Sequence, residues 1–274
     1  MRVVAIRAAL CVLLAATASA GGAQRLPRIV SINPCVDTVL VRVADPRQIA
    51  AISHYSQDPR ATSIPLATAM RFKAISGTAE EVVALSPDLV IAGGHVDPAT
   101  IGALKRLRIK LVQLPVPTTI AENNAQIRTI AQAAGQGARG ERLVAKIDAA
   151  VRAAAPSADA AFTPALIWQG GGLVPGSGTL SDDMLRAAGF RNLSASYGLK
   201  QWDILPLEYL VARPPRVLLS VGAVNPNDRL LGHPVLQRLK GRMAIRAYPD
   251  RLMQCGGPIV IDAVRRLAAI RRSL

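Results

Sequence analysis

Two stretches of the chain share one pattern, and this pattern determines the fold class. Residues Ala79–Ala92 read AEEVVALSPDLVIA, and residues Leu207–Ser220 read LEYLVARPPRVLLS. In each stretch a Glu precedes a Pro by seven residues, and an apolar run follows the Pro. A short helix that ends near a proline and leads into a buried strand explains both stretches. We therefore expect one such helix–strand unit in each half of the chain.

The segments around these two units also alternate between apolar strands and helices. Strands are predicted at residues 28–32, 48–52, 88–92, 110–114, 164–169, 216–221 and 243–248, and helices at 34–43, 80–85, 98–107, 179–188 and 258–272. Strands that alternate with helices are typical of α/β architecture with parallel sheets.

The middle of the chain is helical without strands. This stretch runs from Thr119 to about Ala155, and Gly135-Gln136-Gly137 interrupts it. The part after the glycines keeps apolar residues at a spacing of four, as an amphipathic helix requires. We therefore predict two Rossmann-like α/β lobes, at residues 21–136 and 158–274, joined by one long backbone helix at residues 137–157.

The first 20 residues have the features of a secretory signal. Arg2 and Arg7 supply positive charge, residues 8–16 are apolar, and Ala18-Ser19-Ala20 fits a cleavage site. The apolar run is too short to span a bilayer as a helix. We predict cleavage after Ala20 and a periplasmic location.

Composition limits the classes of partner. The 274 residues are 50% hydrophobic but only 3% aromatic, with a formal net charge of +15. Lys and Arg are scattered through the sequence rather than gathered in blocks with aromatic residues, which argues against nucleic-acid binding. The positive charge and the few aromatic residues favour an anionic or strongly polar ligand.

Four segments together resemble a known family. They are RIVSINPCVDTVL (28–40), EEVVALSPDLVIAGG (80–94), GSGTLSDDMLRAAGFRNL (176–193) and LEYLVARPPRVLLS (207–220). In this order they resemble the helical-backbone class of periplasmic substrate-binding proteins, which serve ABC importers of ferric siderophores, heme and cobalamin. The resemblance implies a monomer that is not an enzyme, holds a metal chelate between its lobes and delivers it to a permease–ATPase complex at the inner membrane. It also implies little hinge motion, because a single helix joins the lobes.

The resemblance assigns a docking role to Glu80 and Glu208, one in each lobe. Family members use such carboxylates to meet arginines of the permease, and exposed rim charges mainly set orientation and association rate. Each Glu also suits the start of a helix, which is the simpler interpretation. Glu81 is the alternative to Glu80.

The candidate ligand-binding residues follow predicted strands, where the fold places its ligands. Trp and Tyr offer flat apolar area with a polar edge, which suits a macrocycle or a catecholate. Trp168 would serve equally well as a core residue. The full set of ligand-binding candidates is Asn33, Cys35, His54, Tyr55, His95, Trp168, Gln169, Trp202, Met253 and Cys255. The glycine-rich segment 170–178 is expected to line the same cleft with its backbone.

Cys35 and Cys255 leave three alternatives open. They could form a disulfide, although this would tie the lobes across the cleft and hinder closure. They could be free thiols, or they could contact a metal-bearing ligand, joined by His54 and His95 if the four residues converge. Their spacing matches no metal motif, so the metal content is left unknown and no resident cofactor is predicted.

Three other functions compete with chelate binding, one of them a non-transport sensor or structural protein of the same fold. A bare metal-ion binding protein of the same fold would need several ligating side chains, and the chain has only three His. An exported hydrolase could use Cys35 or Cys255 with a His, but a nucleophile of this kind needs a base within reach, and no such motif is present.

Overall fold

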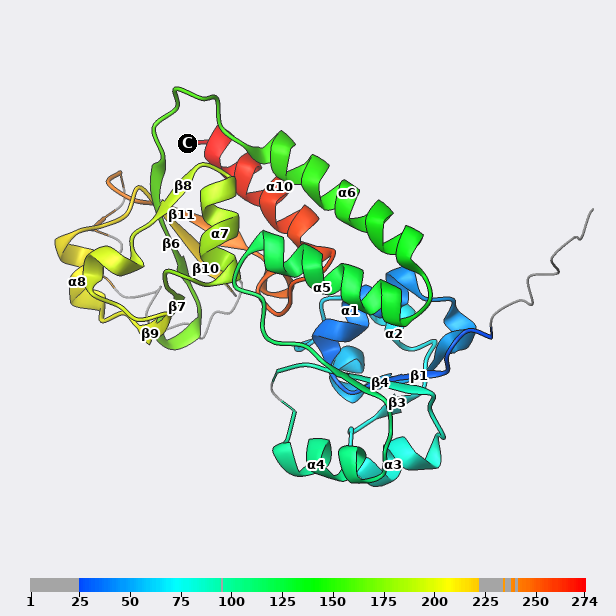
Figure 1. Cartoon of the computed structure of the whole chain (residues 1–274). Coiled ribbons are helices and arrows are strands. Elements are labelled where there is room, and N and C mark those ends of the chain that lie inside the picture. Colours follow the sequence, from blue (N-terminus) through cyan, green and yellow to red (C-terminus); the bar gives the residue numbers. More distant parts are fainter. Residues whose placement is uncertain (1–24, 95, 222–233, 235–237, 240) are drawn as a thin grey trace, which may run out of the picture.

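The computed structural model describes residues 25–94, 96–221, 234, 238, 239 and 241–274. The predicted signal segment and His95 lie outside these residues. Figure 1 shows two α/β lobes and a long helix that runs between them, so the predicted fold class is confirmed. No helix in the described part of the chain combines the length and hydropathy that a membrane span needs.

The N-terminal lobe is a five-stranded parallel sheet with helices on both faces. Its strands lie in the order β3 (Ala74–Ile75), β2 (Ile49–Ser53), β1 (Ile29–Ser31), β4 (Leu89–Ala92) and β5 (Leu111–Gln113). Helices α3 (Ala79–Ala84) and α4 (Pro98–Arg106) cover one face, and α1 (Pro34–Val43) packs on the other. Because successive side chains of a strand point to opposite faces, Val30 packs toward α3 and α4 while Ile29 packs toward α1.

The C-terminal lobe is built in the same way around four parallel strands. Their order is β11 (Ala244–Tyr248), β10 (Val217–Val221), β6 (Thr163–Trp168) and β8 (Phe190–Asn192). Helices α7 (Leu180–Ala187) and α10 (Ile259–Arg272) cover one face, and α8 (Leu207–Ala212) covers the other. A small antiparallel ribbon of β7 (Leu173–Pro175) and β9 (Trp202–Ile204) stands beside this sheet.

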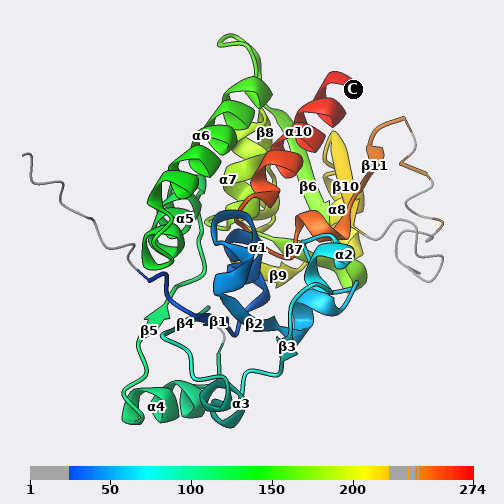
Figure 2. The ribbon, with the colours of Figure 1, turned by 90° about the vertical axis from the view of Figure 1, so that its right-hand side faces the viewer.

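Two helices connect the lobes. Helix α5 (Ile120–Ala133) ends where Gly135 takes a positive φ, and α6 (Gly137–Ala154) follows, so the expected break at these glycines is confirmed. Helix α6 ends before the expected residue 157, because Pro156 forces Ala155 into an extended conformation. Figure 2 shows α5 and α6 side by side. The residue limits of the two lobes stay a prediction.

One apolar core runs through both lobes. It includes Leu40 of α1, Ile127 of α5, Ile147 of α6, Leu185 of α7 and Val264 of α10, each with almost no exposed surface. The helices between the two sheets therefore share their buried faces. This packing fixes the position of one lobe against the other.

The sequence did not predict the shortest elements. They are the strands β3, β7, β8 and β9, the helix α2 (Leu66–Ala69), and the 3-10 turns η1 (Pro46–Gln48), η2 (His54–Gln57), η3 (Gly170–Gly172), η4 (Ser194–Tyr197) and η5 (Asp250–Leu252). Each is too short to show an apolar period, so partners distant in sequence decide its conformation.

The segment before α10 packs closely against α1 at Gly257. This residue has a φ of +71°, and a Cβ added there would lie 2.5 Å from Oγ1 of Thr38. We expect Gly257→Ala to lower the free energy of unfolding by about 1 to 2 kcal/mol for the left-handed backbone. The crowding against Thr38 should add about 1 to 3 kcal/mol more. Urea denaturation would measure the total.

Gly198→Ala is the matched control. Gly198 has a φ of +74°, but a Cβ there would meet nothing within 4 Å. Its variant should therefore show the backbone cost alone. Equal destabilisation by the two variants would contradict the tight contact between α1 and α10.

A buried carboxyl makes stability depend on pH. Asp37 of α1 is fully buried, and its Oδ2 accepts hydrogen bonds from the backbone N–H of Ser53 at 2.9 Å and from Oγ of Ser56 at 2.6 Å. Oδ1 has no hydrogen-bond partner among the described residues. Burial outweighs these hydrogen bonds and raises the pKa of Asp37 to about 7.

The folded protein therefore keeps a proton on Asp37 that the unfolded chain has already lost. The resulting stability is complete below the unfolded pKa of 3.8 and is lost as the pH rises through about 7. The loss should reach roughly 4 kcal/mol. Asp37→Asn keeps the acceptor oxygen and should flatten this slope, as urea midpoints measured from pH 4 to pH 8 would show. Parallel curves for variant and wild type would contradict the raised pKa.

Candidate functional site

A cavity of about 580 Å³ lies between the two lobes. Its lining comes from the ends of β1, β4 and β5, from α1 and α5, and from the segments that begin α7 and α10. The lining residues are Asn33, Cys35, Val36, Val39, Gly93, Gly94, residues 114–118, Asn123, Gln126, Ile130, residues 179–181, Met184, Gln201, Trp202 and residues 252–257. Because both lobes contribute, a molecule in this cavity would contact both at once.

On the N-terminal side, Asn33 organises the wall. Its side-chain oxygen accepts hydrogen bonds from the backbone N–H groups of Cys35 and Val36, at 2.9 and 3.2 Å, and so caps α1. A Cβ on Gly93 would collide with the Asn33 amide, so glycine lets β4 end close to this cap. Asn33 itself is part of the cavity lining.

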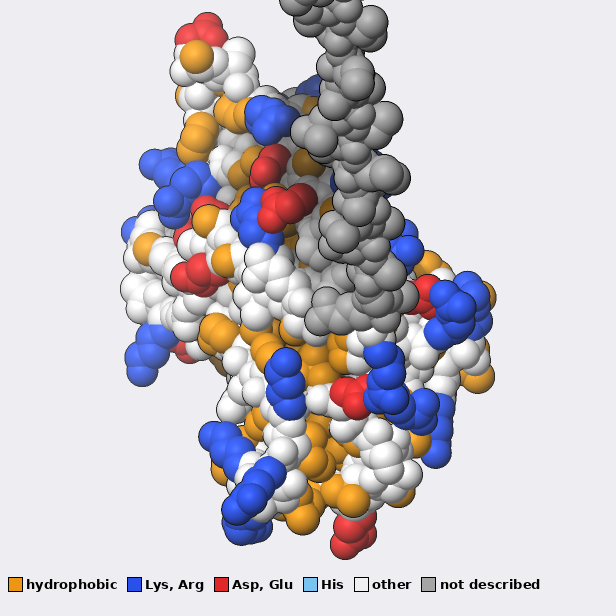
Figure 3. All heavy atoms as spheres, turned by 45° about the vertical axis from the view of Figure 1, so that its right-hand side comes forward, with side chains coloured by type: hydrophobic (Ala, Val, Ile, Leu, Met, Phe, Trp, Pro, Cys, Tyr) orange, Lys and Arg blue, Asp and Glu red, His pale blue; other side chains and the backbone are white. Residues whose placement is uncertain are grey.

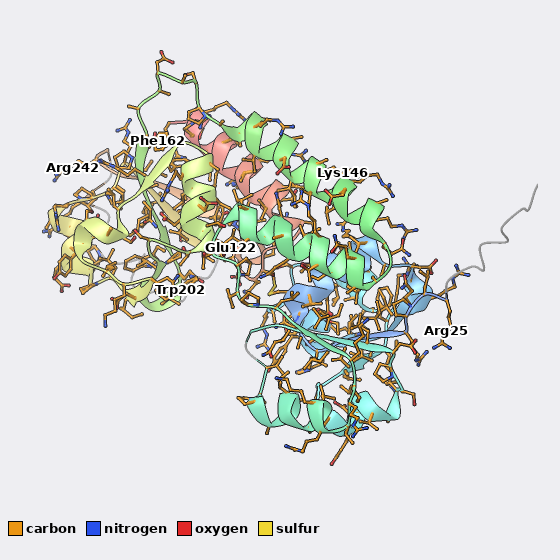
Figure 4. The ribbon with its side chains drawn as sticks, viewed as in Figure 1. Arg25, Glu122, Lys146, Phe162, Trp202 and Arg242 are labelled. Atoms are coloured by element: carbon orange, nitrogen blue, oxygen red, sulfur yellow. A yellow bond between two sulfur atoms is a disulfide. The ribbon has the colours of Figure 1, made fainter. Side chains whose placement is uncertain are left out.

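On the C-terminal side, the glycine-rich segment holds the strand that carries Trp202. The Gly176 N–H donates to the carbonyl of Gln201 at 2.6 Å, and a Cβ on Gly176 would collide with the carbonyl of Lys200. Trp202 is 48% exposed at this edge. Figure 4 shows it on the side of its lobe that faces the N-terminal lobe. The expectation that residues 170–178 line the cavity is wrong, because none of them is part of the lining; they support the strand that carries Trp202 instead.

Cys35 and Cys255 form a disulfide. Their Cα atoms are 5.1 Å apart, although 220 residues separate them in sequence. Cys35 begins α1 in one lobe, and Cys255 precedes α10 in the other. The bond lies beside the close approach of Gly257 to Thr38, so the two segments that it joins are also packed together. Of the three alternatives for the two cysteines, the structure has the disulfide.

The cavity wall is electrically neutral in the part of the chain that the structure describes. None of its described lining residues is charged. Four helices begin at the cavity. Three of them, α5, α7 and α10, have an acidic residue in the first turn that offsets the partial positive charge of the helix end. In α1 the first-turn acid is the buried Asp37, whose raised pKa keeps it from carrying a full charge. The Thr118 backbone N–H and hydroxyl lower the pKa of Glu122, so its carboxylate stays ionised at the start of α5.

The scattered positive charge of the sequence does not gather at this wall. On the face shown in Figure 3, Lys and Arg side chains stand singly or in small groups, several of them beside Asp or Glu. The described lining gives no support to the expectation of an anionic ligand.

Five of the predicted ligand-binding residues line the cavity. They are Asn33, Cys35, Trp202, Met253 and Cys255. The Ser181 hydroxyl oxygen lies 3.9 Å from the sulfur of Met253. This polarizable side chain therefore connects the loop before α10 to the start of α7. The expectation that residues after the strands face the cleft holds for these five positions.

Four others lie elsewhere. Trp168 has no exposed surface and packs in the core beneath α8, because its position on β6 points away from the shared helices. Gln169 is not part of the lining. His54 and Tyr55 are exposed and their rings lie 4.0 Å apart, but they follow β2, toward the sheet edge opposite β5. His95 lies outside the described residues.

The sequence reasoning overlooked the contribution of α5 and of the loop before it. Asn123 and Gln126 line the cavity, as does the run Leu114–Thr118. Asn123 also accepts the N–H of Gly257 and so joins α5 to α10. The sequence did offer a signal for these residues. Two adjacent Asn and then Gln126 follow the start of a helix that otherwise packs in the core, and polar side chains in such a place need a hydrogen-bond partner.

The geometry bears on the competing functions. A disulfide leaves no thiolate at Cys35 or Cys255, which a hydrolase of the kind considered would need. His54 does not join the two cysteines at the cavity. No group of three or more His, Cys, Asp or Glu side chains suited to a metal ion occurs within the described residues. The site as described is a neutral, two-lobed cavity suited to binding.

The two proposed docking carboxylates occupy equivalent positions. Glu80 is the second residue of α3, and Glu208 is the second residue of α8; both are exposed. Glu81 accepts hydrogen bonds from Ser76 and caps α3 through Thr78, so it has a structural role. Helices α3 and α8 lie in different lobes, both away from α6 (Figure 1).

Known proteins share this architecture. The chain is 26% identical over 203 residues to the cobalamin-binding protein of Halobacterium salinarum, with 70% of the chain covered. The match spans 53% of that relative, about half its length. The apo form of the periplasmic heme-binding protein RhuT from Roseiflexus sp. RS-1 superposes with a TM-score of 0.72 at 26% identity, covering 89% of this chain and 97% of that one.

A third similarity concerns the fold alone. The periplasmic vitamin B12 binding protein BtuF of Vibrio cholerae has a TM-score of 0.71 at 15% identity, covering 90% of this chain and 97% of that one. The sequence profile of the family described as "Periplasmic binding protein" matches residues 29–241, which include most of both lobes. The chain therefore belongs to the periplasmic binding protein family.

Proposed function

We propose that this protein captures a metal chelate between its lobes and delivers it to an ABC importer at the inner membrane, as a periplasmic, monomeric binding protein rather than an enzyme. The observation that carries the proposal is the cavity of about 580 Å³ lined by both lobes. A cavity of this size lies within the range of small-molecule sites. Export by the signal at residues 1–20 belongs to the same proposal.

The lining favours a large chelate with an uncharged periphery. A macrocycle would fill the cavity and extend past its rim, where the exposed Trp202 ring can stack on it. Amide side chains of Asn33, Gln126 and Gln201 can exchange hydrogen bonds with neutral polar substituents. Among ferric siderophores, heme and cobalamin, these features fit a corrinoid best, in keeping with the cobalamin-binding relative.

The first test is a titration of the protein with cyanocobalamin, heme and a panel of ferric siderophores, followed by tryptophan fluorescence. Saturable quenching by one of them is the expected result. Trp202→Ala should then weaken binding by about tenfold or more, because it removes a large stacking surface at the rim. Equilibrium dialysis would measure both affinities without relying on tryptophan.

Ile204→Ala is the matched control for Trp202→Ala. Ile204 lies on the same strand and is 54% exposed, but it is not part of the cavity lining. Its variant should bind as the wild type does. Absence of binding by any of the chelates in the folded protein would contradict the proposed function.

A second test addresses delivery. Glu80→Gln and Glu208→Gln should each slow uptake through the importer that the protein serves, by roughly tenfold at low concentration of the binding protein, and leave chelate affinity unchanged. Uptake into proteoliposomes and equilibrium dialysis would separate the two effects. Asp159→Asn, in the exposed loop between α6 and β6, is the charge-matched control. Uptake at the wild-type rate in the double Glu variant would rule out the docking role.

A further inference from the structure

The Cys35–Cys255 disulfide is the second covalent link between the lobes. The backbone passes from the first sheet to the second through α5 and α6. The disulfide joins the start of α1 to the segment that begins α10, at the floor of the cavity. Cys35 is half-buried and Cys255 is 8% exposed, and both line the cavity. A ligand in the cavity would therefore cover the bond.

The contacts around the bond depend on a close fit. A Cβ on Gly256 would lie 2.6 Å from Oδ1 of Asn123, and one on Gly257 would lie 2.5 Å from Oγ1 of Thr38. The Asn123 amide in turn donates to the Gly257 carbonyl at 3.4 Å. These contacts place the residues on either side of Cys255 directly against α1 and α5. They would be the first to change if the two cysteines separated.

We propose that the disulfide is a redox-sensitive strap that holds the cavity floor in its binding geometry. When the bond is intact, α1 and the start of α10 stay together and the ligand binds without a large closure. When a dithiol reduces it, the S–S bond breaks, two thiols form on Cys35 and Cys255, and the dithiol becomes a cyclic disulfide. The floor then loosens and ligand binding weakens. The ligand part of this proposal rests on the proposed function.

Thermodynamic linkage connects two measurable quantities, the affinity for the ligand and the equilibrium of disulfide reduction. If the reduced protein binds its ligand more weakly by some factor, the ligand must stabilise the disulfide against reduction by the same factor. Coupling between two sites in one protein is typically about 5- to 150-fold. We therefore expect reduction to weaken binding at least about fivefold. Bound ligand should also slow reduction, because it covers the sulfur atoms.

The first experiment needs no ligand. Hydrogen exchange would be compared between the oxidised protein and the protein reduced with dithiothreitol, in peptides covering residues 33–43 and 253–263. We expect faster exchange in both after reduction, and unchanged exchange in helix α8, residues 207–212, which covers the opposite face of the C-terminal sheet. Unchanged exchange in the first two peptides would overturn the strap. Reoxidation should restore the original rates in the same sample.

The second experiment uses cyanocobalamin, with hemin as a second probe. Cys35→Ser combined with Cys255→Ser removes the strap without a reductant, and only Cys11 of the predicted signal remains as a further cysteine. The double variant should bind the probe at least about fivefold more weakly than the oxidised wild type. Dithiothreitol should not change the double variant further, which controls for direct effects of the reductant on the probe.

The outcomes separate the two proposals. Equal affinities of the oxidised wild type and the double variant, or equal equilibrium constants for reduction by dithiothreitol with and without bound cyanocobalamin, would overturn the redox-sensitive strap. Failure of both probes to bind the oxidised wild type would instead overturn the proposed corrinoid or heme ligand. Hydrogen exchange in the ligand-free protein would still decide whether the disulfide holds the floor.

Discussion

The apolar core shared by the two lobes is the constraint on which the rest of the structure depends. Helices α1, α5, α6, α7 and α10 bury their faces against each other, so neither sheet can move independently of the other. A core packed to ordinary protein density resists gradual deformation. The cavity is therefore a space whose width is set by helix packing, and its walls are already in place before a ligand arrives.

This constraint explains why polar atoms at the cavity come from helix starts. In a parallel sheet the strands end at the same edge, and the helices that follow them begin there. Asn33, Thr119 and Thr179 cap three of these helices with their side chains. The caps and the acidic first turns satisfy the helix ends internally. The surface that remains for a ligand consists of amides, methylenes, one exposed indole and sulfur. Such a surface recognises a ligand by its shape and by neutral hydrogen bonds rather than by its charge.

The alternation of strands and helices was predictable because apolar runs and prolines mark it locally, as at Pro34 and Pro87. The end of α6 at Pro156 was missed. The site was predictable only in part. Polar neighbours on both sides favoured ligand contact for Trp202, but the sequence left Trp168 equally as a core or a ligand residue; Trp168 is buried in the core and Trp202 is exposed at the rim. Whether a tryptophan is buried depends on the face of the sheet to which its strand position points, and on whether another layer covers that face.

Local sequence could not identify the disulfide either, since 220 residues lie between Cys35 and Cys255. The expectation that such a bond would hinder closure assumed that the lobes move by a hinge. In a protein whose lobes share one core, the floor of the cleft has no large motion to lose. A covalent bond there limits small separations of α1 and α10. The helical core restrains these motions least, because both helices begin at the cavity and the core does not surround their first residues. The disulfide and the shared core thus both restrain the separation of α1 from α10, the disulfide at the cavity and the core along the rest of the two helices.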